Sequence, residues 1–400
     1  MVMNAFNLLI LFSVTIILGY IGSIIFEKTK IPDVIWLMGL GLIVGPIFKL
    51  VDTNLFISMS LFMSAIALII ILYDAGLNMN FYQLIRGVPR SGLLAVLNIL
   101  FSMFAVGYAA KFFLGLDLIT GMLLGAILGG TSSPIILTIV EGLKIKGNTR
   151  TFIELESIIT DPLCIVVSIA LIDIIVSGLP LMAGIQNIFS AFSIAIVLGL
   201  VAGVIWLTFL DKLRGRQFDY MLTLAVIFLL YVFTETVGGS GAISALSFGI
   251  VLGNARIFSR IFKLSKLFSV DKVMKKFHTE ISFFIRSFFF VYIGLILSIK
   301  QEFIIYGVGI SLILILIRFA AVHIATIGMG ITKLELNMVR VLSARGLAAA
   351  VLAQLPRAYG VPGSDFFSNI VFTVIVVSVI YTSFSTMYFF RDRDNKTIKQ

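Results

Sequence analysis

The chain has little charge, one cysteine and two histidines in 400 residues. Charged residues make up 12% of it, whereas soluble domains carry about 25%, and this excludes an ordinary soluble protein. The one cysteine, Cys164, excludes an internal disulfide and a thiolate metal site. The histidines, His278 and His323, lie far along the chain from the candidate ligands described below, so a nitrogen-ligated metal is not expected.

Hydrophobic residues make up 60% of the chain and form long runs from end to end. A run of about 20 residues crosses roughly 30 Å of hydrocarbon, and in lipid such a run must be a helix, because its backbone groups need internal partners. The first run is too long for a signal-peptide core and no small-residue cleavage site follows it, so we expect it to be retained. The sequence predicts an all-α polytopic membrane protein with about 13 transmembrane helices, near 4–26, 34–50, 57–77, 91–115, 118–143, 150–176, 183–210, 218–237, 240–256, 277–298, 302–328, 335–356 and 366–390.

The basic residues indicate how the helices are oriented. With the N-terminus outside, the loops assigned to the cytoplasm hold 22 lysines and arginines and the opposite loops hold 4. The positive-inside rule favours this orientation, which places the C-terminus in the cytoplasm. The net charge of +10 is then mostly topological, and no nucleic-acid partner is expected. The loop at 256–276 is basic enough to contact anionic lipid as well.

Two pairs of distant segments share a glycine pattern. "LGLIVG" at 40–45 resembles "FGIVLG" at 248–253, and "DAGL" at 74–77 resembles "YIGL" at 292–295. Members of each pair are seven segments apart and therefore run in opposite directions. This predicts two inverted six-helix repeats, segments 1–6 and 8–13, with segment 7 as a linker. Glycine pairs of this spacing are also common where helices simply pack together.

An inverted repeat places its binding site at the midplane, between helices that break at matching positions. Segment 5 contains "GGTSSPI" (129–135) and segment 12 contains "LSARGLAAA" (342–350). Both stretches are rich in small and polar residues. We therefore expect segments 5 and 12 to be discontinuous and to cross.

Ionisable residues at membrane depth are costly and are by default functional candidates; they are Asp74, Glu156, Asp161, Arg286, Arg318 and Arg345. Asp161 lies eleven residues after Arg150, about 16 Å along a helix, and Ser157 lies one turn earlier on the same face. Pro162 frees a backbone carbonyl upstream. Hydroxyls of the segment 5 break complete a set of hard oxygen ligands for an alkali cation: Thr131, Ser132 and Ser133.

Burial disfavours the charged form of a carboxylate, so either a proton or a cation must neutralise Asp161, and hardly both. Competition at one site that opens alternately to each side gives cation/proton exchange. Such exchange needs no covalent chemistry and no cofactor, so an enzyme is not expected. The alternative is that Asp161 forms a structural ion pair with Arg286 or Arg345.

The other charged residues are predicted to form pairs. Glu156 is one residue off the face of Asp161, and we expect it to pair with an arginine, preferably Arg286. Arg345 is expected to neutralise the crossing of segments 5 and 12, with Asp74 as a possible partner. Arg318 is expected to be structural or to extend its side chain to the interface.

Several stretches of the sequence resemble those of a known family. "ESIITDP" (156–162) resembles the Glu-Ser-x-x-Asn-Asp signature of the monovalent cation:proton antiporters, specifically the NhaP-type sodium/proton antiporters. Further matching stretches occur in the expected order along the whole chain: "IPDVIWLMGLGLIVGP" (31–46), "LYDAGL" (72–77), "TETVGGSGAISALSFGIVLGN" (234–254), "FFFVYIGL" (288–295) and "SARGLAAAVLA" (343–353).

The resemblance implies a single membrane domain over 1–400 that works as a homodimer. An ion-transporting core, about 91–176 and 302–390, would move like an elevator against a dimerisation part, about 1–90 and 183–298. Asp161 would bind the ion and the proton.

By matching position, further residues take roles in the resemblance. Ser157 would coordinate the ion, and Glu156 would coordinate it or pair with arginine. Thr131 would match the unwound crossing of segment 5, and Arg286 and Arg345 would match the arginines of segments 10 and 12. Asp74 falls where relatives carry an acidic residue beside the site.

Two departures from the family pattern concern the site. Thr160 stands where Asn or Asp is usual; a neutral residue there implies electroneutral one-for-one exchange, and the missing amide implies a looser crossing. Thr131-Ser132-Ser133-Pro134 replaces Thr-Asp-Pro, which leaves the coordinating oxygen of segment 5 open. It also leaves the choice of sodium or potassium open, since selectivity depends on cavity size and ligand number.

The leading hypothesis is a sodium (or lithium)/proton antiporter of the cell membrane. The alternative is a potassium/proton antiporter, with or without control by a soluble domain after residue 400. A cation channel is a remote one, because no carbonyl filter signature is visible. The partners expected in every case are the monovalent cation, H⁺, the bilayer and a second copy of the chain.

Overall fold

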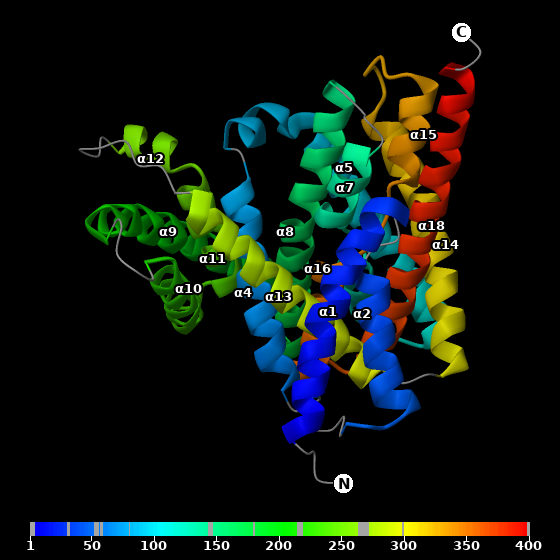
Figure 1. The fold of residues 1–400 in the computed structure, drawn as a ribbon, viewed down its shortest axis with the longest axis horizontal. Coiled ribbons are helices and arrows are strands. Elements are labelled where there is room, and N and C mark those ends of the chain that lie inside the picture. Colours follow the sequence, from blue (N-terminus) through cyan, green and yellow to red (C-terminus); the bar gives the residue numbers. More distant parts are fainter. Residues whose placement is uncertain are drawn as a thin grey trace. The chain divides into compact units, whose positions relative to one another are not determined.

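The computed structural model describes the chain apart from residues 1–4, 30–32, 52–55, 57–58, 80, 143–146, 179–180, 214–218, 263–271, 298–299 and 398–400. Within the described residues the structure is helical and has no strand (Figure 1). The helices up to the end of predicted segment 6 are α1 (Ala5–Thr29), α2 (Asp33–Leu42) with the π-helix η1 (Ile43–Ile47), α4 (Ser60–Asn78), α5 (Phe81–Leu114), α6 (Leu118–Ile127), α7 (Ser133–Gly142) and α8 (Asn148–Ser177).

The remaining helices are α9 (Leu181–Leu213), α10 (Asp219–Thr236), α11 (Gly241–Gly253), α12 (Ala255–Ile261), α13 (Lys272–Ile296), α14 (Gln301–Ala325), α15 (Lys333–Val341), α16 (Leu347–Leu352), α17 (Leu355–Ala358) and α18 (Phe367–Thr397). Every predicted segment overlaps at least one helix, so the all-α prediction is confirmed. In the described residues six helices are long and apolar enough to cross a membrane, or seven if the bent pair α11–α12 is one span. The count of thirteen spans is therefore not confirmed.

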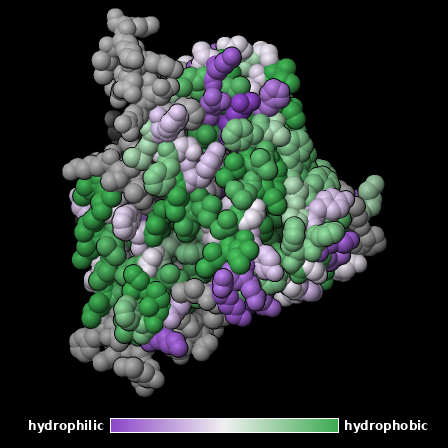
Figure 2. Space-filling view, turned by 90° about the vertical axis from the view of Figure 1, so that its right-hand side faces the viewer, coloured by the Kyte–Doolittle hydropathy of each residue, from purple (hydrophilic) through white to green (hydrophobic). Residues whose placement is uncertain are grey.

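Apolar side chains cover much of the outer surface. Figure 2 shows hydrophobic residues over much of the face in view. On α5, for example, Phe104, Tyr108 and Phe112 are exposed at a spacing of four residues, and Phe112 is 89% exposed. Side chains four apart share one helix face, and monomeric soluble proteins rarely expose large contiguous apolar patches. This surface belongs to a multi-pass membrane protein.

The helices form two compact units. The first holds residues 1–64, 87–176 and 287–400, and the second holds 65–86 and 177–286. In the first unit α14 packs on α18, α15 contacts both of them, and α16 contacts α6 and α18. In the second unit α11 packs on α9 and α10, around a core that includes Tyr73, Trp206 and Phe248.

The glycine pattern of the sequence has a structural cause in the first unit. Gly41 of α2 faces Gly294 of α13: a Cβ at Gly41 would lie 2.8 Å from Gly294 Cα and 2.9 Å from Leu295 N, and it would also meet the Val291 carbonyl oxygen. One turn on, a Cβ at Gly45 would lie 2.6 Å from Leu295 O. These glycines are required because the two backbones touch.

The second unit repeats this contact residue for residue. Gly249 of α11 takes the place of Gly41, and a Cβ there would meet Tyr73 O and, at 3.1 Å, Leu77 N of α4. Gly253 takes the place of Gly45 and meets Leu77 O, while Gly76 takes the place of Gly294. Segments 2 and 10 therefore pack as segments 9 and 3 do. This is the packing that an inverted repeat requires.

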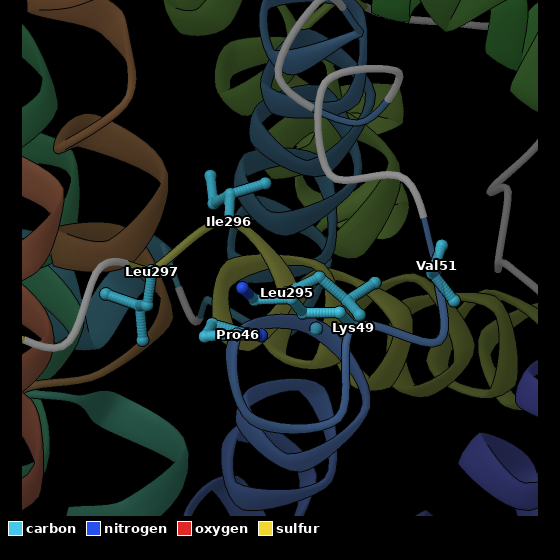
Figure 3. Close-up of a pocket in the computed structure, with 7 residues that line it drawn as sticks. Pro46, Lys49, Val51, Leu295, Ile296 and Leu297 are labelled. Carbon is cyan, nitrogen blue, oxygen red and sulfur yellow. The ribbon is translucent and has the colours of Figure 1, made fainter. Parts of the chain in front are cut away.

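The chain leaves η1 through a strained lysine. Lys49 has φ 50°, the one left-handed residue other than glycine in the described chain, and its N–H donates to Gly45 O at 2.8 Å while Leu50 N–H donates to Val44 O at 2.9 Å. Glycine is usual at this position of a helix end. Beside it, the ends of η1 and α13 enclose a cavity of about 240 Å³ that Pro46 and Leu297 help to line (Figure 3).

The glycine contact can be tested on α2. We expect Gly41→Ala to lower the free energy of unfolding by about 1–3 kcal/mol, the usual cost of overpacking, because its Cβ would overlap the backbone of α13. Gly39→Ala on the same helix is the control, because nothing lies within 4 Å of a Cβ there; alanine should stabilise that position by up to about 1 kcal/mol. Thermal unfolding in detergent measures both, and equal melting temperatures would contradict the proposed contact.

Candidate functional site

The candidate site lies in the first unit, where two helices break. Segment 5 is α6 and α7 with residues 128–132 non-helical between them, and segment 12 is α15 and α16 with residues 342–346 non-helical between them. Gly129 and Gly130 weaken the helix before the first break, and Pro134 has no N–H to continue it. Both predicted breaks are confirmed.

Hydrogen bonds tie the two breaks together. Ser132 N–H donates to Ala344 O at 2.8 Å. The Arg345 side chain, which is 1% exposed, donates from Nε to Leu128 O at 3.0 Å and from Nη1 to Ser343 O. Arg345 therefore neutralises the carbonyl ends of the crossing, as predicted from its position, and does so through backbone groups.

Neighbouring helices supply the remaining partners. Asn98 of α5 donates from Nδ2 to Gly129 O at 2.7 Å. On α18, Ser378 Oγ accepts the Arg345 N–H at 3.0 Å and Thr382 Oγ1 accepts the Ser343 N–H at 3.3 Å. The sequence prediction missed Asn98, Ser378 and Thr382. Their signal is a polar side chain within an apolar segment, which is weak because many such residues bond to their own helix.

Glu156 of α8 pairs with Arg318 of α14. Arg318 Nη1 lies 2.7 Å from Glu156 Oε1 and Nη2 lies 3.2 Å from Oε2, and both residues are 0% exposed. Thr131 Oγ1 lies 3.3 Å from each carboxylate oxygen. The predicted pairing with Arg286 is therefore wrong, and so is the idea that Arg318 extends to the interface. Arg318 lies deep in α14, where only a paired charge is tolerated.

Asp74 and Arg286 belong to the second unit. Asp74 Oδ1 accepts from Asn78 Nδ2 at 3.0 Å, and its main charged neighbour is Arg286. The prediction that Asp74 partners Arg345 is wrong, because the guanidinium of Arg345 bonds to backbone carbonyls. The sequence predicts both residues as site candidates from their depth in the membrane and from the family resemblance, and the structure places them in the second unit.

Asp161 of α8 is half-buried and bonds to segment 5. Ser133 Oγ lies 3.0 Å from Asp161 Oδ2 and 2.8 Å from Ser157 O. Among the described residues no ion pair involves Asp161, so the alternative of a structural pair with Arg286 or Arg345 is not what the structure has. A carboxylate next to hydroxyl and carbonyl oxygens can hold a hard cation.

The side chains of α8 that the sequence predicts beside Asp161 form other hydrogen bonds. Ser157 Oγ donates to Ile153 O at 2.8 Å, within its own helix. Thr160 Oγ1 accepts the Thr131 N–H at 3.3 Å and lies 3.4 Å from Thr131 O. The expectation that Thr160 loosens the crossing is wrong, because its hydroxyl accepts the N–H of the break and donates either to Thr131 O or to Ser157 O, which lies 3.1 Å away. The carbonyl of Ser157, rather than its hydroxyl, faces Ser133.

A cap outside the apolar spans joins the helices that carry the site. Thr332 and Glu335 form a capping box at the start of α15, and Thr149 of α8 donates to Glu335 Oε1 at 3.1 Å. The donors of Thr332 and Thr149 hold the pKa of Glu335 below its ordinary value. The beginnings of α8 and α15 are thus joined through one carboxylate.

Comparison with known proteins points to one family. The family described as "Sodium/hydrogen exchanger, transmembrane" matches residues 13–391. The chain is 25% identical over 395 residues to a K(+)/H(+) antiporter NhaP of Alkalimonas amylolytica, covering 96% of this chain and 66% of that protein. It is 28% identical over 293 residues to a probable Na(+)/H(+) antiporter 2 of Methanocaldococcus jannaschii, covering 70% and 67%.

The fold resembles a solved antiporter. The structure of the sodium proton antiporter MjNhaP1 from Methanocaldococcus jannaschii at pH 8 superimposes with a TM-score of 0.79 at 23% identity, covering 95% of this chain and 97% of that one. The chain spans about two thirds of the length of the K(+)/H(+) antiporters that it matches, 66% and 65% for two of them.

The buried pair can be tested by removing one or both charges. We expect Arg318→Leu to lower the free energy of unfolding by about 3–5 kcal/mol, because it leaves Glu156 buried without a partner. The double variant Arg318→Leu with Glu156→Leu should recover most of this loss. Arg150→Ala is the control: its pair with Glu154 is partly exposed and contributes about 1 kcal/mol or less. An additive double variant would contradict the pairing.

The cap gives a prediction on pH. Because the folded-state pKa of Glu335 is depressed, its ionised form contributes stability above the ordinary pKa of about 4.3, and this contribution is lost as the pH falls through the folded-state pKa. Glu335→Gln should therefore melt at a lower temperature than the wild type at pH 7, and the difference should shrink below pH 4. Thr332→Ala should cost about 1 kcal/mol. A difference independent of pH would contradict the role of the charge.

Proposed function

Because the chain belongs to the family of transmembrane sodium/hydrogen exchangers, we propose that it exchanges a monovalent cation, Na⁺ or Li⁺, for H⁺ by alternating access. The observation that carries this proposal is the contrast between two carboxylates on α8. Glu156 is fully buried and neutralised by Arg318. Asp161 is half-buried, accepts a hydrogen bond from Ser133 and has no ion pair among the described residues, so it is the carboxylate left to be neutralised by cargo.

The charges favour a one-for-one exchange. Glu156 and Arg318 cancel, and Arg345 faces backbone carbonyls. Only Asp161 changes its charge state between a proton and a cation, and a second carboxylate is absent at positions 131–133 and 160. Each half-cycle then carries one positive charge on one carboxylate, so the exchange is electroneutral. Either a proton or a cation neutralises Asp161, and this lowers the cost of its burial while the site moves between the two sides of the membrane.

A second candidate cargo is K⁺. Relatives named K(+)/H(+) antiporters match 94–96% of the chain, whereas a relative named as a probable Na(+)/H(+) antiporter matches 70%. Neutral hydroxyls replace the segment 5 carboxylate of the family pattern, and ligand number and cavity size decide selectivity among hard cations. Transport assays with each cation alone separate the two candidates.

The tied breaks support a moving part that contains both of them. Ser132, Ala344 and Arg345 lock segments 5 and 12 together, and Ser133 joins them to α8. We propose that residues about 91–176 and 302–390 carry the site between the two sides, against a dimerisation part of about 1–90 and 183–298. In this proposal the N-terminus is outside, the C-terminus is cytoplasmic and the protein is a homodimer.

The exchange is tested in proteoliposomes with an internal pH dye. Addition of Na⁺ or Li⁺ should move protons in the wild type, and Asp161→Asn should abolish the movement, because an amide neither ionises nor neutralises a cation. Asp173→Asn is the matched control on α8, at an exposed position three turns further on, and should keep the movement. Transport by Asp161→Asn would overturn the proposal, and planar-bilayer currents above carrier turnover would indicate a channel instead.

A further inference from the structure

The three hydroxyls of the segment 5 break have different partners. Thr131 Oγ1 lies 3.3 Å from both oxygens of Glu156 and from Thr160 Oγ1. Ser132 lies against Gly346, where no room is left even for a Cβ. Only Ser133 has a hydrogen bond to Asp161 in the described chain. The sequence therefore contains three candidate ligands, and the structure separates them.

The Ser133 hydroxyl has one hydrogen and two acceptors. Its oxygen lies 2.8 Å from Ser157 O and 3.0 Å from Asp161 Oδ2. A hydroxyl donates one hydrogen bond and keeps two lone pairs. When the hydrogen points to Asp161, it solvates the free carboxylate. When it points to Ser157 O, the lone pairs are free for a cation that lies beside Asp161.

We propose that Ser133 is the segment 5 ligand of the transported cation, and that the Ser157 carbonyl holds its hydrogen while the cation is bound. This inference rests on the proposed function. It assigns the ligand role to Ser133 and a structural role to Thr131, whose hydroxyl is held by the Glu156–Arg318 pair. Reorientation of one O–H bond is the whole rearrangement that binding requires.

The exposure of the residues supports this assignment. Asp161 and Ser133 are half-buried, whereas Glu156, Thr131 and Thr160 are each 0% exposed. The Ser133–Asp161 pair therefore has surface that a cation can reach, whereas Thr131 has none. Ser133 also begins α7, whose N-terminal backbone dipoles disfavour a cation. These dipoles weaken the binding of the cation by Asp161. A carrier needs such weakening because it must release its cargo.

The test compares variants of Ser133 with the wild type in proteoliposomes, using Na⁺, Li⁺ and K⁺ in turn. Ser133→Ala should raise the KM for the preferred cation about tenfold and change the maximal rate by about twofold or less, since one charge-assisted oxygen contact is lost. Ser133→Thr keeps the hydroxyl and should restore the KM. Ser168→Ala is the control: Ser168 is buried on α8 and its hydroxyl has no partner among the described residues.

A binding measurement separates the ligand role from a structural one. Added cation should raise the melting temperature of the wild type and of Ser133→Thr in detergent, and should raise that of Ser133→Ala only at about tenfold higher concentration. Ser133→Cys covers the case in which alanine does not fold, because a thiol of similar size is a poor ligand for a hard cation. It should behave as alanine does.

The outcomes are distinguishable. If the wild type shows no cation-dependent proton movement, the proposed function fails. If the wild type exchanges cations but the alanine and cysteine variants keep its KM and its stabilisation by cation, the role of Ser133 is overturned and the exchange stands. A loss confined to the maximal rate, or an equal rise of KM in Ser168→Ala, would also overturn it.

Discussion

A broken helix in hydrocarbon exposes backbone groups that have no water to bond with, and each unsatisfied group costs several kcal/mol. This constraint organises the first unit. The carbonyls of Leu128 and Gly129 accept hydrogen bonds from Arg345 and Asn98, respectively. The Ser132 N–H donates to Ala344 O, and the Ser343 N–H donates to Thr382 Oγ1. Because these contacts do not use the Ser133 hydroxyl, it is left to donate to Asp161 or to the Ser157 carbonyl.

Glu156 and Asp161, two carboxylates five residues apart on α8, lie in opposite surroundings. Glu156 faces Arg318 and is sealed from the outside, and a buried pair of this kind is fixed, since breaking it leaves an unpaired charge. Asp161 faces hydroxyl and carbonyl oxygens at the edge of the packed unit. The first carboxylate contributes to structure, and the second has no ion pair among the described residues. Their difference comes from their surroundings, since the helix presents both.

The hydropathy and glycine patterns predict the helices, the two breaks and the repeated packing, because lipid leaves the chain few alternatives. The partner of Glu156 is not predictable in this way: Arg286, Arg318 and Arg345 are equivalent by composition, and only the folded structure shows that Arg318 of α14 lies beside Glu156. The prediction that Thr160 loosens the crossing is wrong for a related reason. Its resemblance to the family pattern suggested a missing amide, while the structure shows a hydroxyl that reaches both backbone groups of Thr131.

The repeats share their scaffold and differ in their chemistry. Thr160 of α8 accepts the N–H of Thr131 in one break, and Thr382 of α18 accepts the N–H of Ser343 in the other and donates to Val341 O. The next residue is Asp161 in the first case and Ser383 in the second. A threonine that closes a break is thus followed once by a carboxylate and once by a hydroxyl. Packing fixes the first position in both halves, and the second position decides which half holds the carboxylate to which the proposed function assigns the cargo.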